Sequence, residues 1–477
     1  MTGDNTLKLV DETLRDGTQS LWGMMMSYHM IEPVIGEIGE IGFDTVMPPV
    51  HGAYPTIWAR FFKEDPREVL SMVRNKLTNT KSNVRIIGVG TATNLSKPFE
   101  NKTVAKMCYQ YLKEAVPQIN EFALITCTQD ELRRIYPVIF PTFRSLGIEP
   151  IPYLGIGHSS RFTEEYYASQ TKEIVEKYKP KSICIKDVNG LLTPERLRKI
   201  LAAIQEVADG TPFEFHGHGM NGLHSYNAVV AMQMGVRKIS TCIPPLAYDS
   251  SHPSVFNVIS NAEEMGISPD MDVDVEKMKE VSDRLTKIGE AYGHPVDNHL
   301  LPFDLTDYNH QIPGGVISNT KTQLAQLGLS DMIEDVLEEI PRILEELGNP
   351  QMVTPFSQFI VTQAVLNVHA GRWEQCLDSI IEFAAGMFGY EEAGVPYMDQ
   401  NLKDKLFSLP QAKAIIERAD NYDHYINEDL SEAECKKRAG LSPNDSIERY
   451  ALKVCMEGED ELANVTQGGP DFYKKYL

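Results

Sequence analysis

Short runs of apolar and β-branched residues recur through the first 245 residues, and each is followed by a polar stretch with helical spacing. The runs are LKLVDE, DTVMPPV, VRIIGVG, FALITC, EPIPYLGIG, SICIKDV, FEFHGHG and KISTCIP. After the sixth run, Thr193 and Pro194 predict an N-cap followed by proline at the first helical position. Strands that alternate with helices in this way indicate βαβ units and a parallel sheet.

Eight such units within about 250 residues is the count of a TIM (β/α)8 barrel. A doubly wound sheet is the competing arrangement. It fits less well, because Gly88-Val89-Gly90 lacks the third glycine of a dinucleotide-binding fingerprint and the units continue to eight. The pattern therefore predicts an α/β fold built on a TIM barrel.

Beyond about residue 300 the pattern becomes helical, with apolar residues at i, i+3 and i+4. The segments are SDMIEDVLEEIPRILEELG, TPFSQFIVTQAVLNVHAG and CLDSIIEFAAGMFG. The turn-rich stretch PVDNHLLPFDLTDYNHQIPGG before them predicts an extended crossover loop. We expect a barrel domain in residues 1–300 and an α-helical C-terminal domain in residues 301–477.

The composition is that of a soluble globular protein, with 42% hydrophobic and 23% charged residues. The net charge of −22 argues against nucleic-acid and anionic-membrane partners. No apolar run approaches the roughly 20 residues that span a bilayer, and the N-terminus lacks a signal-like apolar region. The seven cysteines show no C-x-x-C spacing, so we expect reduced thiols and a cytoplasmic location. They are Cys108, Cys127, Cys184, Cys242, Cys376, Cys435 and Cys455.

Polar residues stand where three of the predicted strands end, which in a TIM barrel is the active-site face. Asp16 follows the first strand, Lys186 and Asp187 end the sixth, and His216 and His218 end the seventh. Histidines at i and i+2 share one face of a strand, and with a carboxylate they suit a divalent transition metal. Two unrelated histidines and a strand-end ion pair remain the alternative. An ammonium beside a metal is repelled, but a buried Lys186 carrying a carbamate would supply an anionic oxygen ligand.

These residues belong to longer motifs that resemble the carboxyltransferase component of biotin-dependent enzymes. The motifs are DETLRDGTQSLW, IKDVNGLLTPERL, HGHGMNG, YNHQIPGGVISNTKTQL and GNPQMVTPFSQFIVTQAVLNVHAGRW. The group includes the oxaloacetate decarboxylase alpha subunit, the carboxyltransferase half of pyruvate carboxylase and the pyruvate-side subunit of transcarboxylase. HQIPGG, VTPFSQ and QAVLNV distinguish it from its barrel relatives, whereas LRDG-x-Q suits isopropylmalate synthases and hydroxymethylglutaryl-CoA lyases equally well.

The resemblance implies a catalytic site that holds zinc, manganese or cobalt. Its implied metal ligands are Asp16, Lys186 as a carbamate, His216 and His218. Arg15 and Gln19 correspond to the groups that orient the keto acid and stabilise its enolate. Thr354 corresponds to a hydroxyl that relays a proton to or from biotin, with Ser357 and Gln358 beside it in the biotin-binding segment. Thr354 before a proline also suits a helix N-cap, and both roles are compatible.

The resemblance also implies partners. No A-M-K-M biotin-attachment stretch occurs and no lipoyl-like β domain ends the sequence, so we expect biotin on a separate carrier protein. Biotin carboxylase or membrane decarboxylase subunits are the further implied partners, and the chain itself is expected to form a homodimer.

The sequence departs from the family around the acceptor pocket. RDGTQS, GMMMS at residues 23–27 and Met220 replace more polar family residues, and Val89 or a neighbour replaces an expected carboxylate-binding arginine. These changes predict an acceptor larger or less anionic than pyruvate, unless Arg60 or Arg85 supplies another anchor.

Two other functions remain open. A Claisen-type lyase or synthase of the same barrel superfamily shares RDGTQ and HGHGMNGLHSYN, but gives PGG and VTP-x-SQ no role. A non-catalytic scaffold within a carboxylase complex is the other, and the four retained ligand positions speak against it.

Overall fold

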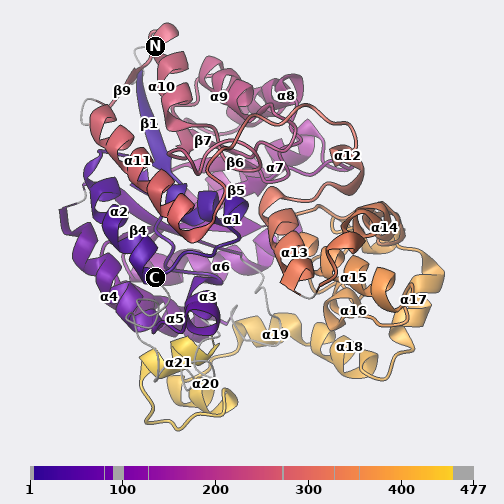
Figure 1. Cartoon of the computed structure of the whole chain (residues 1–477). Helices are drawn as coiled ribbons and strands as arrows, with labels where there is room; N and C mark the ends of the chain where they lie inside the picture. Colours follow the sequence, from indigo (N-terminus) through magenta and orange to yellow (C-terminus); the bar gives the residue numbers. More distant parts are fainter. Residues whose placement is uncertain are drawn as a thin grey trace.

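Eight parallel strands close into a barrel in the computed structural model of the chain (Figure 1). The structure describes residues 5–79, 81–89, 101–126, 128–270, 273–326, 328–353 and 355–454. The strands are β1 Thr6–Asp11, β2 Thr45–Val46, β3 Asn83–Val89, β4 Ile119–Thr126, β5 Glu149–Gly155, β6 Ile183–Asp187, β7 Phe213–Gly217 and β8 Lys238–Thr241. Consecutive strands pair, and β1 joins both β8 and β2, which closes the ring. All eight predicted strands are confirmed, and β9 (Ser268–Pro269) adds a short pairing to β1.

Helices surround the barrel and cover its outer face (Figure 1). They are α1 Thr18–Leu21, α2 Tyr28–Glu40, α3 Tyr54–Ile57, α4 Pro66–Lys76, α5 Lys102–Ala115, α6 Gln129–Ser145, α7 Glu164–Tyr178, α8 Pro194–Glu206, α9 His224–Gln233, α10 Val255–Glu264 and α11 Val275–Tyr292. Thr193 caps α8 as predicted: its side chain accepts a hydrogen bond from the Arg196 N–H, and Pro194 is the first helical residue.

Alternation along the strands decides which side chains enter the barrel. Ile183 and Ile185 of β6 pack outward against the helices, whereas Cys184 belongs to the separate apolar cluster inside the ring. Because successive strand residues face opposite sides, Lys186 continues the inward row of Cys184. On β7 the same rule turns Phe215 outward and His216 inward.

The amino ends of the strands hold a buried charge layer centred on Arg85. Its guanidinium is fully buried and forms ion pairs of 2.7 Å with Glu121 and 2.6 Å with Glu214. Glu214 stands two residues before His216, so this layer lies deeper in the barrel than the histidines. Arg85 is therefore committed to internal ion pairs and does not anchor an acceptor, while Arg60 lies at an exposed position.

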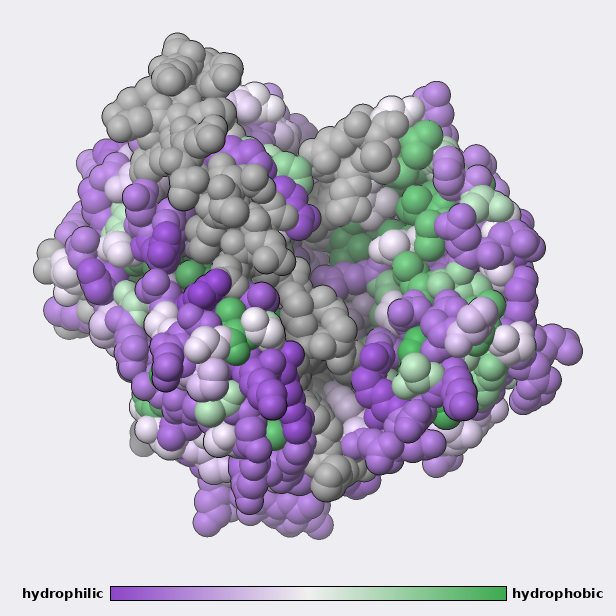
Figure 2. All heavy atoms as spheres, turned by 90° about the horizontal axis from the view of Figure 1, so that it is seen from below, coloured by the Kyte–Doolittle hydropathy of each residue, from purple (hydrophilic) through white to green (hydrophobic). Residues whose placement is uncertain are grey.

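A second hydrophobic cluster lies in the helical region after the barrel. The helices are α12 Asp307–His310, α13 Gly314–Gln326, α14 Ile333–Glu346, α15 Phe356–Ala370, α16 Asp378–Ala384, α17 Gln400–Phe407, α18 Ala412–Asp420 and α19 Tyr422–Asn427. The three predicted helical segments are confirmed as α14, α15 and α16. Seen from below, a hollow separates the barrel from this region, and hydrophobic residues flank it on the helical side (Figure 2).

The last two described helices return to the barrel. Helices α20 (Glu432–Arg438) and α21 (Ile447–Val454) pack on α5, where Tyr450 joins an apolar cluster with Val104 and Met107. The predicted domain boundary near residue 300 stays a prediction.

Cysteine oxidation differs in part from the expectation. Cys184, Cys242, Cys376 and Cys435 are free thiols. Cys108 is disulfide-bonded, so the prediction of reduced cysteines is wrong at that position. Sequence spacing gave no warning, because a disulfide depends on the distance between two cysteines in space and not on their separation along the chain. Within the described residues, no helix is long and apolar enough to cross a membrane.

Candidate functional site

Four buried side chains converge at the carboxyl ends of β1, β7 and β8. One donor atom each from Asp16, His216, His218 and His252 lies within 4.8 Å of the others. Asp16 stands in the π-helical turn Thr13–Gly17 after β1, and His252 stands in the loop that follows β8. Asp16 Oδ2 lies 3.4 Å from Nε2 of His216 and 3.5 Å from Nε2 of both His218 and His252.

Hydrogen bonds at Nδ1, on the side of each ring that faces away from the cluster, orient the three imidazoles. Nδ1 of His216 lies 3.1 Å from the Glu12 carboxylate, Nδ1 of His218 lies 2.9 Å from the Ser250 carbonyl, and Nδ1 of His252 lies 3.1 Å from the carbonyl of Gly217. Carbonyl and carboxylate oxygens accept hydrogen bonds, so each Nδ1 carries the proton. The Nε2 lone pairs then point into the cluster, as in histidine ligands backed by a second acceptor.

The pKa shifts of Asp16, His216 and His252 favour the forms in which these side chains bind metals. Burial opposes ionisation of Asp16, but Arg15 and His218 outweigh it and hold the pKa of Asp16 well below its ordinary value. Burial and the neighbouring His216 and His218 together lower the pKa of His252 to about 3. Burial also lowers the pKa of His216. A carboxylate and neutral imidazoles are the forms that bind metals.

The cluster fits a divalent transition metal by its donor chemistry. Three imidazole nitrogens and one carboxylate oxygen suit zinc, manganese or cobalt. Nε2 of His252 is fully buried, yet it makes no hydrogen bond to any described residue. A buried polar atom is normally satisfied, so this lone pair indicates a missing partner at the centre of the cluster.

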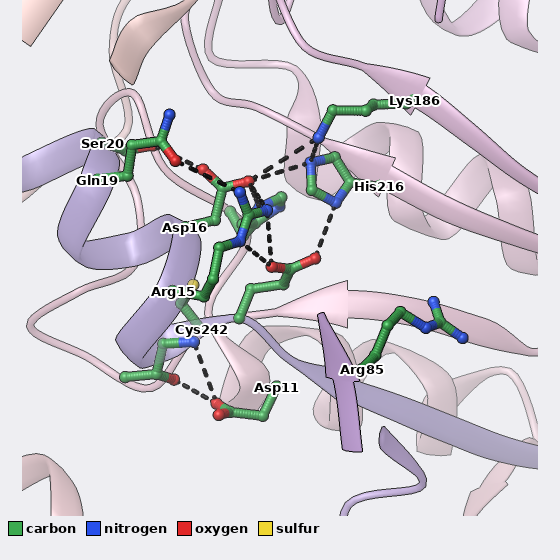
Figure 3. Close-up of polar contacts among 12 residues, drawn as sticks. Asp11, Arg15, Asp16, Gln19, Ser20, Arg85, Lys186, His216 and Cys242 are labelled. Atoms are coloured by element: carbon green, nitrogen blue, oxygen red, sulfur yellow. Dashed lines mark hydrogen bonds and ion pairs between the residues drawn. The ribbon is translucent and has the colours of Figure 1, made fainter. Parts of the chain in front are cut away.

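Lys186 borders the cluster from β6 (Figure 3). Its Nζ lies 2.6 Å from Nε2 of His216 and 3.9 Å from Asp16 Oδ2. Burial lowers its pKa to about 8. Asp187, the other half of the strand-end pair, turns away and accepts hydrogen bonds from the N–H groups of Leu191 and Leu192. The two residues are therefore not an ion pair.

Arg15 lies next to Asp16 at the edge of the cluster (Figure 3). Its guanidinium donates to Glu12 at 2.9 and 3.1 Å and to Asp16, and its remaining amino group reaches the Gln19 side-chain oxygen at 3.4 Å. Two buried carboxylates raise the pKa of Arg15 against the opposing effect of burial. A permanently charged guanidinium next to an amide gives the site fixed hydrogen-bond donors for an oxyanion.

The PGG motif brings the helical region onto the rim of the barrel. A side chain at Gly314 would overlap Ser250, and one at Gly315 would lie 3.2 Å from Cγ of Gln19. At position 314 only glycine allows so close an approach, whereas at position 315 the Gln19 side chain would have to shift slightly. The motif therefore joins α13 to the residues that border the histidine cluster.

The VTP segment is attached to the ends of β5 and β6. The Asn189 amide donates to the Met352 carbonyl at 2.7 Å, and the Gln351 amide donates to the Gly155 carbonyl. Thr354 itself lies outside the described residues. Ser357 is fully buried, and its hydroxyl has no hydrogen-bond partner among them, whereas Gln358 is exposed.

The structure brings together Asp16, Lys186, His216, His218, Arg15 and Gln19 from the predicted set. His252 is the functional candidate that the sequence reasoning missed. A histidine shortly after the eighth strand was the available signal, but SSHP has no ligand spacing. The methionines Met24 and Met26 lie in the barrel's hydrophobic core, and the side chain of Val89 lies outside the described residues.

Two family models match the chain. The HMGL-like model covers residues 6–284, and the model of the conserved carboxylase domain covers residues 308–452.

Several relatives are about a quarter identical to this chain over the aligned residues. The 2-oxoglutarate carboxylase large subunit of Hydrogenobacter thermophilus is 27% identical over 93% of this chain and 66% of its own. A pyruvate carboxylase subunit of Methanocaldococcus jannaschii is 28% identical over 82% of this chain and 67% of its own. The methylmalonyl-CoA carboxyltransferase 5S subunit of Propionibacterium freudenreichii is 25% identical over 81% and 74%. The chain thus spans about two thirds of the length of the first two relatives.

The fold matches a solved structure. The carboxyl transferase domain of Rhizobium etli pyruvate carboxylase superposes with a TM-score of 0.77 and 19% identity, over 98% of this chain and 78% of the other. At this identity the match establishes the fold.

Proposed function

Because the chain belongs to the HMGL-like family, and its sequence and fold are those of biotin-dependent carboxyltransferases, we propose that it moves CO2 between carboxybiotin and a 2-oxo acid. The observation that carries this proposal is the contact between the conserved carboxylase domain and the residues that border the histidine cluster. Gly314 meets Ser250, whose carbonyl orients His218, and Gly315 meets Gln19. A Claisen-type enzyme has no use for this contact, and it therefore favours the carboxyltransferase.

We place the metal on Asp16, His216 and His218. A bound zinc, manganese or cobalt ion would supply a Lewis acid for the oxygen that becomes negative in the enolate. Arg15 is positioned to donate to the same oxygen, and Gln19 to orient the acceptor. Each of these groups is held by contacts within the protein, so little reorganisation is needed as charge develops.

We assign the proton exchange with biotin to Thr354, with Ser357 and Gln358 in the segment that receives biotin. A hydroxyl both accepts and donates a proton, which suits transfer in either direction. The attachment of residues 351–353 to the ends of β5 and β6 supports this assignment, because it fixes the start of the segment to the barrel.

The acceptor that we propose is a 2-oxo acid of pyruvate or 2-oxoglutarate type. The names of two relatives include pyruvate and 2-oxoglutarate, and the relative aligned over 93% of this chain is the 2-oxoglutarate enzyme. A larger acceptor agrees with the altered family positions near Val89. Carboxyl transfer to pyruvate gives oxaloacetate. Transfer to 2-oxoglutarate adds a carboxyl group to the carbon next to its carbonyl carbon.

We further propose a biotin carrier protein and a biotin carboxylase or decarboxylase subunit as partners, a homodimeric chain and a cytoplasmic location. The subunit names of the relatives support a multi-component enzyme.

The test is a transfer assay with the purified chain and a biotinylated carrier loaded with labelled CO2. We expect label in the 2-oxo acid product only when chain, carrier and acceptor are all present. Pyruvate and 2-oxoglutarate are compared at equal concentration. Cleavage of hydroxymethylglutaryl-CoA, or acetyl-CoA-dependent condensation without any carrier, would instead establish the Claisen-type alternative.

A further inference from the structure

A cavity of about 420 Å³ opens at the amino ends of β6, β7, β8 and β1, at the end of the barrel opposite the histidine cluster. Its volume lies within the range of about 300–1,000 Å³ that is usual for small-molecule sites. Glu214 lines the cavity and also pairs with Arg85 at 2.6 Å, so the buried charge layer lies between the cavity and the cluster. A ligand in this cavity would therefore not touch the histidines.

The lining of this cavity is positively charged, although the chain as a whole is strongly acidic. Four cationic side chains and two carboxylates contribute to the lining, an excess of two positive charges, whereas the whole chain carries −22. The cations are Lys8, Lys181, Arg237 and Lys238, and the carboxylates are Asp44 and Glu214. A cavity lined by one sign of charge concentrates the electric field and attracts ions of the opposite sign.

Two of the four cations are already neutralised by carboxylates. Nζ of Lys238 lies 2.6 Å from Asp44 and 3.5 Å from Glu214. Nζ of Lys181 lies 2.5 Å from Glu121 in the buried charge layer. These lysines hold the amino ends of the strands together, so the excess positive charge belongs to the other two cations.

Arg237 carries a guanidinium that is fixed in place but not neutralised. Its Nε donates to the side-chain oxygen of Asn5 at 3.1 Å, and its Nη1 donates to the carbonyls of Met232 and Val236 at 2.7 and 3.1 Å. All three acceptors are neutral. The other amino group, Nη2, makes no hydrogen bond to any residue that the structure describes. Its two N–H donors are therefore free for an anion.

Lys8 is the second cation without a carboxylate partner in the described part of the chain. Its neighbours Leu7 and Leu9 pack outward in the main hydrophobic core, so Lys8 faces the inside of the ring. Its register partner on β8 is Lys238. Like charges on paired strand positions repel each other and destabilise the pairing. A bound anion would remove this repulsion.

Apolar residues complete the lining of the cavity. They are Ala208, Pro212 and Val236. An organic ligand would bury its carbon atoms against them, whereas an inorganic ion would gain nothing from the contact. The lining therefore favours an organic anion.

We propose that this cavity is a binding site for a small organic anion with two negative charges, carried by carboxylate or phosphate groups. Lys8 and Arg237 bind the charged groups, and the apolar residues contact the carbon skeleton. The two charges of the ligand match the two excess positive charges of the lining. The site goes beyond carboxyl transfer, because its ligand is distinct from the acceptor and binds at the opposite end of the barrel.

The experiment titrates succinate and glycerol 3-phosphate into the purified chain by isothermal titration calorimetry, with sodium chloride at equal ionic strength as the reference. Succinate carries two carboxylates and glycerol 3-phosphate carries a phosphate, so the two probes distinguish the two kinds of ligand. We expect at least one of them to bind at one site per chain, with a Kd of about 1 mM or lower. The same probe should raise Tm above its value in chloride. Binding of neither probe would overturn the proposal.

Lys8→Met and Arg237→Gln test the site directly. Each should weaken binding by about tenfold or more, the usual effect of losing a hydrogen bond from a charged group. Lys8 forms no ion pair within the described residues, so Lys8→Met should fold like the wild type even if Arg237→Gln does not. Lys172→Met is the matched control, because it removes one exposed charge on α7 outside the cavity, and it should bind like the wild type. Unchanged binding in Lys8→Met would overturn the proposal.

Lys186→Met separates this site from the histidine cluster, because Lys186 lies at the carboxyl end of β6. We expect this variant to bind the probes like the wild type. Binding that is lost in Lys186→Met and kept in Lys8→Met would place the ligand at the cluster and contradict the proposal. None of these measurements uses carboxyl transfer, so a failure of the proposed function leaves the anion site standing.

Discussion

Lys186 and His216 are register partners on β6 and β7, and the lysine amine lies 2.6 Å from Nε2 of the histidine. The amine thus lies at the border of the cluster formed by Asp16, His216, His218 and His252. Both side chains are buried. Because water is largely excluded there, their electrostatic interactions with a bound acceptor would be stronger than at the protein surface.

Replacing this amine should impair the reaction without emptying the metal site. We expect Lys186→Met to lower kcat for carboxyl transfer by about 100-fold or more, the usual effect of losing a positioned proton-transfer group. Metal content, measured by mass spectrometry, should stay at the wild-type level. Lys199→Met is the control, since Lys199 is exposed on α8, and it should leave both quantities unchanged. A Lys186→Met enzyme with normal kcat would contradict the prediction.

The close approach of Gly314 to Ser250 predicts that one methyl group disturbs the metal centre from the helical region. In Gly314→Ala the new carbon must displace the loop whose Ser250 carbonyl orients His218. We expect metal affinity to fall at least tenfold, measured by competition with a chelator. Gly315→Ala meets only the flexible Gln19 side chain, so its affinity should change less. Equal effects in the two variants would show that the loop does not transmit the displacement.

Because Arg85 forms buried ion pairs, replacing it should strongly reduce the stability of the folded protein without directly changing the metal site. Arg85→Met leaves the carboxylates of Glu121 and Glu214 buried without their main partner. We expect a loss of about 3–5 kcal/mol in the free energy of unfolding. Denaturation followed by the fluorescence of Trp22 and Trp58, both in the barrel core, provides the measurement. Adding Glu121→Gln and Glu214→Gln to Arg85→Met should recover part of the loss, and a further drop would refute this explanation.

Glu64 should make the stability of the folded chain depend on pH in a predictable direction. Burial raises its pKa from 4.5 to about 7, and one of its oxygens has no partner among the described residues. The folded chain therefore binds this proton more tightly than the unfolded chain, so stability falls as pH rises from about 4.5 to 7 and stays lower above it. Glu64→Gln keeps an acceptor for the Tyr28 N–H and should be about 1–3 kcal/mol more stable at pH 8.

The comparison at pH 4.5 is the internal control, because wild type and Glu64→Gln should then be equally stable. Glu68→Gln, on the neighbouring helix α4, should show no such pH-dependent gain. A constant difference between wild type and Glu64→Gln at all pH values would show that packing, and not ionisation, separates them.

The barrel was predictable from sequence because buried parallel strands read as short continuous apolar runs. The alternation of Ile185 with Lys186 and of Phe215 with His216 also fixes which side chains enter the ring. That rule places Lys186 and the two strand histidines on the inside of the ring from the sequence alone, whereas Asp16, in the turn after β1, is placed by the motif that it belongs to.

His252 and Arg85 show where the sequence falls short. His252 reaches the site through a loop whose shape depends on hydrogen bonds between its own ends, and no spacing rule encodes that closure. Arg85 stands on an inward-facing strand position that is equally compatible with an acceptor anchor. Its distance from the carboxyl end of β3, and its partners on β4 and β7, became clear only in three dimensions.

The return of α20 and α21 to the barrel adds one more attachment between the helical region and the barrel. Tyr450 packs beside Val104 on α5, far along the chain from the rim contact of Gly314 and Gly315. The hydrogen bonds of Met352 and Gln351 to residues at the ends of β6 and β5 form a further attachment between them. A body held at several separated places cannot swing about any one of them, so the helical region can move as a whole against the barrel only if some of these contacts break.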